Sequence, residues 1–479
     1  MALRTRIRRH LGALLGSPLV AESASFGTAK APGTSRNVPG ELNGRQEAIL
    51  LLQVAASIEH ALMVEYLFAG HSLGGSQVPD SHRMTVGRWR ETILGIAKEE
   101  MGHLMTIQNV LRCIGGPISL DRDDYPWDSE FYPFPFELEP LTRQSLAKYV
   151  YTESPGPDAF SGPEADEIHA LAVKGSGNGT VHRVGALYAR LEDLFSDPDL
   201  VPDGAFREDT FPFQANWDEW GRGYQSGARG NSTGGMMPHT PDLLILPVTA
   251  RTDVLSALDK IAKQGEAATS ASDSEPSHFA RFLRIFREFP RDAGWTPSRN
   301  VAINPVVADQ SGSETYSSDY SVISDAHAIG WAHLFNVRYR LLLVSLLHAF
   351  EYPSNLSERS ELTPRGLLIH STFGEMYNLR ALSDILMDIP IAPGVPETAG
   401  PPFQMPYTMK LPVDLIDRWN LHLDLLESSR KLIHYLQGIP GQRHAVYLRG
   451  LSDIDAHLSG SIHNVADGIQ RQSPITLSR

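Results

Sequence analysis

One helical stretch, residues 97–117 ("AKEEMGHLMTIQNVLRCIGGP"), limits the fold more than any other part of the chain. Its apolar residues predict a buried helix, yet Glu99, Glu100 and His103 interrupt them. A buried carboxylate without a partner costs several kcal/mol, so such a helix needs a counter-charge nearby. Residues three apart lie on one helix face, about 5–6 Å apart at Cβ, so Glu100 and His103 can share a metal ion.

A second Glu-x-x-His pair, Glu275 and His278 in "EPSH", follows later in the chain. In each case the predicted helix that precedes the pair carries a further glutamate. These glutamates are Glu59 in "SIEHALMVEYLFAG" and Glu266 in "IAKQGEAATS". The order Glu, Glu-x-x-His, Glu, Glu-x-x-His is that of four-helix bundles that bind two iron or manganese ions. The sequence therefore predicts a two-metal site with six ligands: Glu59, Glu100, His103, Glu266, Glu275 and His278.

The first two helices leave some choices open. Glu99 competes with Glu100 as the ligand, and the bundle pattern favours Glu100, with Glu99 in a salt bridge or in solvent. Glu65 lies about 120° around its helix from Glu59. An extra ligand, a partner of a ligand and a surface residue all stay open for Glu65. His60 is predicted to be a packed histidine rather than a ligand.

The second pair is less regular than the first. Pro276 disfavours α geometry in the residue before it, so Glu275 is predicted to be the N-cap of its helix, and Asp273 is the alternative ligand. Glu266 lies near a helix end, where solvated carboxylates are common. His278, inside the helix, is better placed.

Helical patterns fill most of the chain, and strand-like alternation is scarce. Glycines 115 and 116 with Pro117 form a strong C-terminal stop. We therefore predict an all-α protein. The expected helices span residues 42–69, 85–114, 142–153, 181–195, 252–268, 275–289, 325–351, 362–388, 410–437 and 441–467.

The order of these helices predicts three regions. Residues 1–40 begin with a basic segment and continue as a Pro-, Gly- and Ser-rich stretch, which favours a disordered arm over a secretion signal. Residues 41–295 hold a four-helix bundle that binds two metal ions, with a long insertion, residues 118–250, between helices two and three. The aromatic loop 125–136 and the glycine-rich segment 221–235 are candidate pocket walls. Residues 296–479 form a further helical region that we expect to pack on the bundle.

Charge and cysteine content exclude several classes of function. The net charge of −14 argues against nucleic acid as a partner, because phosphate binding needs a basic face. No uninterrupted run approaches the length of a membrane span, so no membrane partner is expected. Cys113 is the single cysteine, which excludes an intrachain disulfide and a zinc site built on several thiolates. A cytoplasmic location follows as the default expectation.

Several stretches together resemble a known family. They are "SIEHALMVEYLFAG", "IAKEEMGHLMTIQNVLRCIGGP", "IAKQGEA", "SEPSHFARFLRIF" and "ETAGPPFQ", within about residues 45–405. The chain is similar here to the ferritin-like domain of the iminophenyl-pyruvate dimer synthases of violacein- and rebeccamycin-type bisindole pathways. The resemblance implies a ferritin-like bundle and, position by position, the same six metal ligands that the chain order predicts.

A carboxylate-rich site with one imidazole per metal suits two iron ions, with manganese as the alternative, rather than copper or zinc. With the resemblance, this predicts a non-haem di-iron oxidoreductase that uses dioxygen on a small, amino-acid-derived substrate in secondary metabolism. Two other classes stay open: an iron-binding ferroxidase or storage protein, and a non-catalytic helper of a pathway enzyme. A homodimer and a complex with a pathway partner enzyme are both compatible with the sequence.

Overall fold

The computed structural model contains two compact units. Unit 1 comprises Met1–Trp217 and Gly227–Arg299, and unit 2 comprises Asp218–Ser226 and Asn300–Arg479. The structure describes residues 42–128, 131–177, 179, 181–220, 243–266, 276–291, 294–307, 320–354, 363–406, 409–441 and 443–472. The predicted arm 1–40, the glycine-rich segment 221–235, Asp273 and Glu275 lie outside these described residues. The packing expected between the bundle and residues 296–479 stays a prediction.

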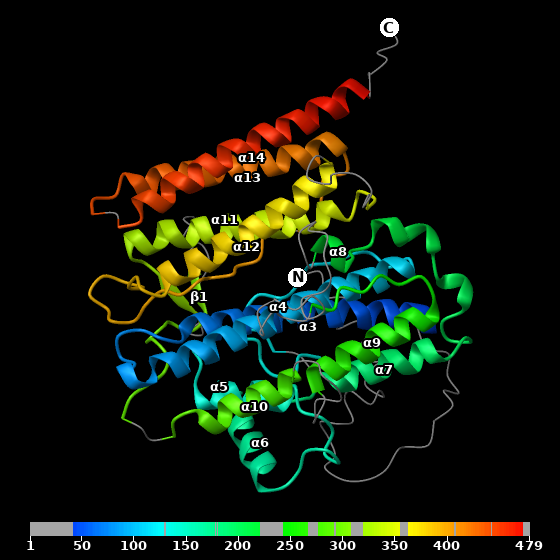
Figure 1. Cartoon of the computed structure of the whole chain (residues 1–479), viewed down its shortest axis with the longest axis horizontal. Coiled ribbons are helices and arrows are strands. Elements are labelled where there is room, and N and C mark those ends of the chain that lie inside the picture. Colours follow the sequence, from blue (N-terminus) through cyan, green and yellow to red (C-terminus); the bar gives the residue numbers. More distant parts are fainter. Residues whose placement is uncertain are drawn as a thin grey trace, which may run out of the picture. The chain divides into compact units, whose positions relative to one another are not determined.

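Two long helices of unit 1, α3 (Gly44–Ser72) and α4 (Arg83–Cys113), pack along each other (Figure 1). A capping box starts α3: the Asn43 side chain accepts from the Gln46 backbone N–H, and the Gln46 side chain accepts from Asn43 N–H. The chain leaves α4 through Gly115, whose φ of +69° is in the left-handed region that favours glycine. The predicted glycine stop thus has a direct conformational reason.

Four shorter helices, α5 (Arg143–Thr152), α7 (Gly185–Ser196), α9 (Arg251–Glu266) and α10 (His278–Glu288), complete the layer opposite α3 and α4. Helix α7 packs on α3 and α9, and α10 packs on α4, α5 and α9. Residues of the predicted insertion therefore form part of the bundle itself. Helix α6 (Pro163–Gly175), which the sequence analysis did not predict, packs on α5. Three short 3₁₀ helices are η1 (Asp80–His82), η2 (Asp203–Ala205) and η3 (Glu208–Phe213).

Unit 2 is built from four helices, α11 (Ala326–Ala349), α12 (Pro364–Leu386), α13 (Leu415–Gln437) and α14 (Ala445–Gln472). Helix α11 packs on α12 and α13, and α14 packs on α13 and α12. A two-stranded parallel sheet, β1 (Pro305–Val307) with β2 (Ser321–Ile323), precedes them. The short helix α8 (Trp217–Trp220) spans the change from unit 1 to unit 2 along the chain.

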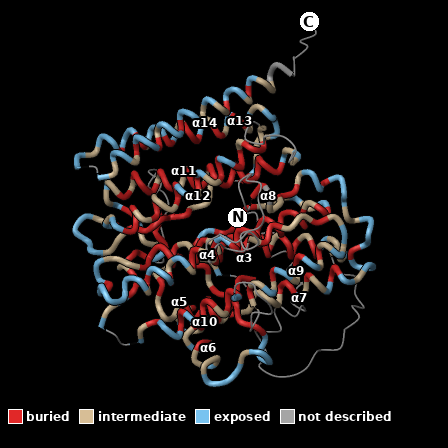
Figure 2. The backbone as a smooth tube through the Cα atoms, viewed as in Figure 1, coloured by how far each residue is buried: buried red, intermediate tan, exposed pale blue. Residues whose placement is uncertain are grey.

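The all-α prediction is confirmed, and the predicted helices fall within a few residues of the observed ones. Helix α3 is long and apolar enough to cross a membrane by composition alone, although no uninterrupted run had suggested it. However, 83% of its most apolar window is buried inside the protein, as in the core helix of a bundle. The buried residues of unit 1 gather along α3 and α4, whereas α14 of unit 2 keeps an exposed face (Figure 2).

Candidate metal centre

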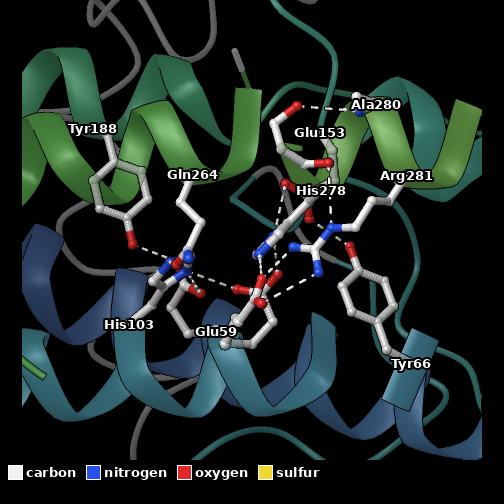
Figure 3. Close-up of polar contacts among 12 residues, drawn as sticks. Glu59, Tyr66, His103, Glu153, Tyr188, Gln264, His278, Ala280 and Arg281 are labelled. Atoms are coloured by element: carbon white, nitrogen blue, oxygen red, sulfur yellow. Dashed lines mark hydrogen bonds and ion pairs between the residues drawn. The ribbon is translucent and has the colours of Figure 1, made fainter. Parts of the chain in front are cut away.

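Two groups of buried acids and histidines lie between the helices of unit 1. Glu59 of α3 joins Glu100 and His103 of α4 in one group. In the other group Glu100 meets Glu153, the C-cap of α5, and His278, the first residue of α10. Within each group the candidate ligand atoms all lie within 4.8 Å of one another. Because Glu100 belongs to both groups, the two groups form one continuous site, which Figure 3 shows around Glu59, His103, Glu153 and His278.

In the first group, His103 turns Nδ1 toward both carboxylates. This nitrogen lies 2.9 Å from Glu100 Oε2 and 3.4 Å from Glu59 Oε2. In the second group, His278 also turns Nδ1 inward, 2.8 Å from Glu100 Oε1 and 3.7 Å from Glu153 Oε2. Each oxygen of Glu100 therefore faces a different imidazole, which is the geometry expected of a carboxylate that bridges two ions.

Three of these atoms, Glu59 Oε2, Glu100 Oε1 and His278 Nδ1, are buried, and their close polar contacts are with other members of the two groups. Several acids buried this close together need a counter-charge. All three are donor atoms that iron or manganese accepts, and all three belong to the two groups. The donor set thus fits a pair of metal ions.

A small cavity lies against these groups. Glu59, Glu100, His103 and Glu153 line it, together with Tyr188 of α7 and residues 261, 262, 265 and 266 of α9. Its interior volume is about 20 Å³, which is room for one or two water-sized groups. The cavity therefore has room for ions and a diatomic molecule beside the ligands.

The protonation states of the site follow from its crowded charges. Burial and Glu100 raise the pKa of Glu59 to about 8. Burial disfavours charge on His103, but Glu100 and Glu59 outweigh this effect and raise its pKa to about 10. Likewise, against burial, its carboxylate neighbours raise the pKa of His278 well above the usual value. Both imidazoles hold protons when no metal is bound, so metal binding must release protons and grows stronger as pH rises.

The Nε2 atom of each histidine, which points away from Glu100, has its own partner. His103 Nε2 lies 2.9 Å from Gln264 Oε1 on α9. His278 Nε2 lies 2.9 Å from Glu99 Oε2 on α4. Such a partner fixes the ring orientation and keeps an N–H on Nε2, so that Nδ1 would bind a metal once it has lost its own proton.

A buried tyrosine binds each outer carboxylate. The Tyr188 hydroxyl donates a short hydrogen bond to Glu59 Oε1, and the Tyr66 hydroxyl donates to Glu153 Oε1 at 2.7 Å. Burial and the adjacent carboxylates raise the pKa of both tyrosines well above the usual value, so both hydroxyls remain protonated donors. The remaining oxygen of each carboxylate faces an imidazole Nδ1.

Four of the six predicted ligands, Glu59, Glu100, His103 and His278, are therefore brought together. Glu266 is half-buried and lines the cavity, but it belongs to neither group. Its carboxylate lies over Gly185, where a Cβ would come within 2.1 Å of Glu266 Oε1. Glu275 lies outside the described residues, so its role stays a prediction.

The residues left open in the sequence have other partners. Glu99 forms a salt bridge with Arg281 and contacts His278 Nε2. It belongs to neither group of candidate ligands. Glu65 is buried outside both groups and accepts a hydrogen bond from the Glu137 N–H at 3.2 Å. His60 is a core residue whose Nδ1 lies 2.9 Å from the Leu120 carbonyl oxygen.

Glu153 is the candidate ligand that sequence reasoning missed. It ends a short helix inside the predicted insertion, and no histidine follows it three residues later. The sequence signal that could have identified Glu153 as a candidate ligand is its position at the end of the helix predicted for residues 142–153. The candidate ligands follow one another along the chain as Glu59, the pair Glu100 and His103, Glu153, and His278. Glu153 is thus the third ligand-bearing segment, a position that the sequence pattern predicts for Glu266.

The two candidates for this third place can be separated by mutation. Glu153→Gln should lower the metal content from two ions per chain to one, because the His278 half loses its outer carboxylate. Glu266→Gln, the matched control, should keep two ions. Metal analysis by mass spectrometry after desalting measures both variants. Loss of an ion from Glu266→Gln alone would restore the original prediction.

Comparisons with known proteins agree with this architecture. A family model described as ferritin-like matches residues 52–287. Dichlorochromopyrrolate synthase of Lentzea aerocolonigenes is 25% identical over 397 residues, 76% of this chain and 36% of that enzyme. The 2-imino-3-(indol-3-yl)propanoate dimerase of Chromobacterium violaceum is 24% identical over 404 residues, 77% of this chain and 35% of that enzyme. The predicted resemblance is thereby confirmed.

The matches are distant and partial. The chain spans about a third of the length of the two curated relatives. A solved structure, a ferritin-like protein from Caulobacter vibrioides, is 18% identical and covers 70% of this chain and 95% of its own, with a TM-score of 0.39. The family-model match supports a ferritin-like fold, and the two curated relatives show a likeness to biosynthetic enzymes.

Proposed function

Because residues 52–287 are a ferritin-like domain similar to two biosynthetic enzymes, we propose that this chain is a non-haem di-iron oxidoreductase. The observation that carries the proposal is Glu100, whose two oxygens face two imidazoles in two buried groups. Its proposed substrates are dioxygen and a small imine derived from an aromatic amino acid. The imine is suggested by the name of the Chromobacterium relative.

The protein's own residues would hold two ions in fixed and unequal surroundings. Glu59 and His103 would bind one ion, Glu153 and His278 the other, and Glu100 would bridge them. Two bound ferrous ions would supply electrons for the reduction of dioxygen. Tyr188 and Tyr66 would hold the outer carboxylates in place through their hydrogen bonds. Burial of the whole set would keep bulk water away from the reacting atoms.

The size of the cavity suggests that dioxygen and the organic substrate would bind at different places. A volume of about 20 Å³ admits dioxygen beside the ligands, but an arylpropanoate imine is far larger than a water-sized group. The organic substrate would therefore react outside the inner cavity, on the side where half-buried Glu266 lines it. A storage protein, in contrast, needs no organic substrate.

Substrate-dependent dioxygen consumption tests the proposal. The chain is loaded with ferrous iron without air, desalted, and mixed with aerated buffer containing the imine formed from indole-3-pyruvate and ammonium. We expect dioxygen uptake that requires both iron and imine, with a coupled product two hydrogens lighter than two imine molecules by mass spectrometry. The two hydrogens, as two electrons and two protons, reduce dioxygen to hydrogen peroxide. Iron uptake far beyond two ions per chain, with no effect of the imine, would contradict the proposal and support iron storage.

A further inference from the structure

Among the described residues, the two halves of the candidate metal centre have the same kinds of ligand and differ in the partners of their imidazoles. Each half has one outer glutamate that accepts a tyrosine hydroxyl, and each has one imidazole with Nδ1 turned inward. They share Glu100. The difference lies behind the imidazoles, at Nε2, where one partner is the neutral amide of Gln264 and the other is the carboxylate of Glu99.

The partner of His278 is a buried, charged pair. Glu99 and His278 are both 0% exposed, and the Arg281 guanidinium binds both oxygens of Glu99, at 3.2 Å for Oε1 and in a shorter contact for Oε2. Arg281 lies one turn after His278 on α10, so the same helix carries the imidazole and the group that holds its partner. The Glu99 carboxylate therefore has a buried cationic partner of its own beside the His278 imidazole.

The partner of His103 is weaker. Gln264 is half-buried near the end of α9, and its oxygen belongs to an uncharged amide. Hydrogen bonds to an ionised acceptor are roughly twice as strong as those between neutral groups. A stronger acceptor at Nε2–H draws the proton away and makes Nδ1 a more basic ligand.

From this difference we infer that the two metal positions are unequal: the half with Glu153 and His278 binds its ion more tightly and fills first. Glu99 is the positioning residue of the tight half, and Gln264 occupies the same role in the weak half. This inference rests on the proposed function, because it presupposes that the two groups bind metal.

A titration of the metal-free chain with Co²⁺, followed by visible absorption, tests the inference without any turnover. The intact chain should bind two ions in two separated steps. Glu99→Gln should weaken the first step by about 10- to 100-fold, the usual effect of losing such an outer partner. Gln264→Glu should strengthen the second step and bring the two affinities together. Glu47→Gln, which removes a buried carboxylate from another glutamate–arginine pair, that with Arg190, should change neither step.

The outcomes separate this inference from the proposed function. Two ions bound with affinities that neither Glu99→Gln nor Gln264→Glu alters would overturn the inequality and leave the di-metal site intact. A chain that binds no Co²⁺ at any concentration would overturn the proposed function instead. If Glu99→Gln fails to fold because Arg281 is left unpaired, the Gln264→Glu titration decides: an unchanged second step contradicts the inference.

Discussion

Replacement of Glu100 by alanine should remove both metal ions from the chain rather than one. Glu100 is the only residue common to the two groups that the structure describes, with Oε2 2.9 Å from His103 Nδ1 and Oε1 2.8 Å from His278 Nδ1. Without this carboxylate each ion keeps one glutamate and one histidine from its group. Loss of the shared carboxylate also removes the negative charge that offsets the electrostatic repulsion between the two adjacent cations.

The comparison variant is Glu59→Ala, which should lose a single ion because Glu59 belongs to one group. Iron per chain, measured by mass spectrometry after ferrous loading and desalting, gives both results, and circular dichroism shows whether the helices survive. We expect two ions in the intact chain, one in Glu59→Ala and none in Glu100→Ala. Two ions retained by Glu100→Ala in a folded chain would rule out a bridging role.

The largest expected effect on stability lies in unit 2, at Arg338. This side chain is fully buried and donates to Glu375 Oε1 at 2.9 Å, to Ser429 Oγ at 2.8 Å and to Asp455 in a shorter contact. It therefore connects α11 with the three other helices of the unit. The two carboxylates raise the pKa of Arg338 although burial opposes its charge, so the arginine remains charged.

Arg338→Met should lower the free energy of unfolding by about 3–5 kcal/mol, because it leaves two buried carboxylates without their cation. Urea unfolding followed by circular dichroism measures the change. Arg430→Met, which removes an exposed arginine paired with Glu427 within α13, should have little effect. Equal urea midpoints of unfolding for the two variants would show that the buried network stabilises the protein no more than an exposed ion pair does.

The sequence predicts the helices well because most of their signals are local. Asn43 and Gln46 mark the start of α3, Gly115 marks the end of α4, and apolar periodicity fixes the faces between them. The Glu-x-x-His spacing of Glu100 and His103 likewise depends on a single helix, so their meeting needs no knowledge of the tertiary fold.

The other contacts of the site depend on tertiary packing. Glu153 reaches Glu100 because α5 packs on α10, and a glutamate at a helix C-cap has no periodic signal of its own. Glu99 and Arg281 form a salt bridge although they are 182 residues apart in the chain. Neither the missed ligand nor the unequal imidazole partners could be inferred from spacing alone.

We propose that the buried carboxylates and imidazoles of unit 1 converge because a pair of metal ions neutralises them. Iron content of the chain, determined after anaerobic loading with ferrous iron and removal of loosely bound metal, tests this claim most directly. We expect two iron ions per folded chain, with protons released on binding. A folded chain that retains no metal ion after this loading would contradict the proposed pair of ions.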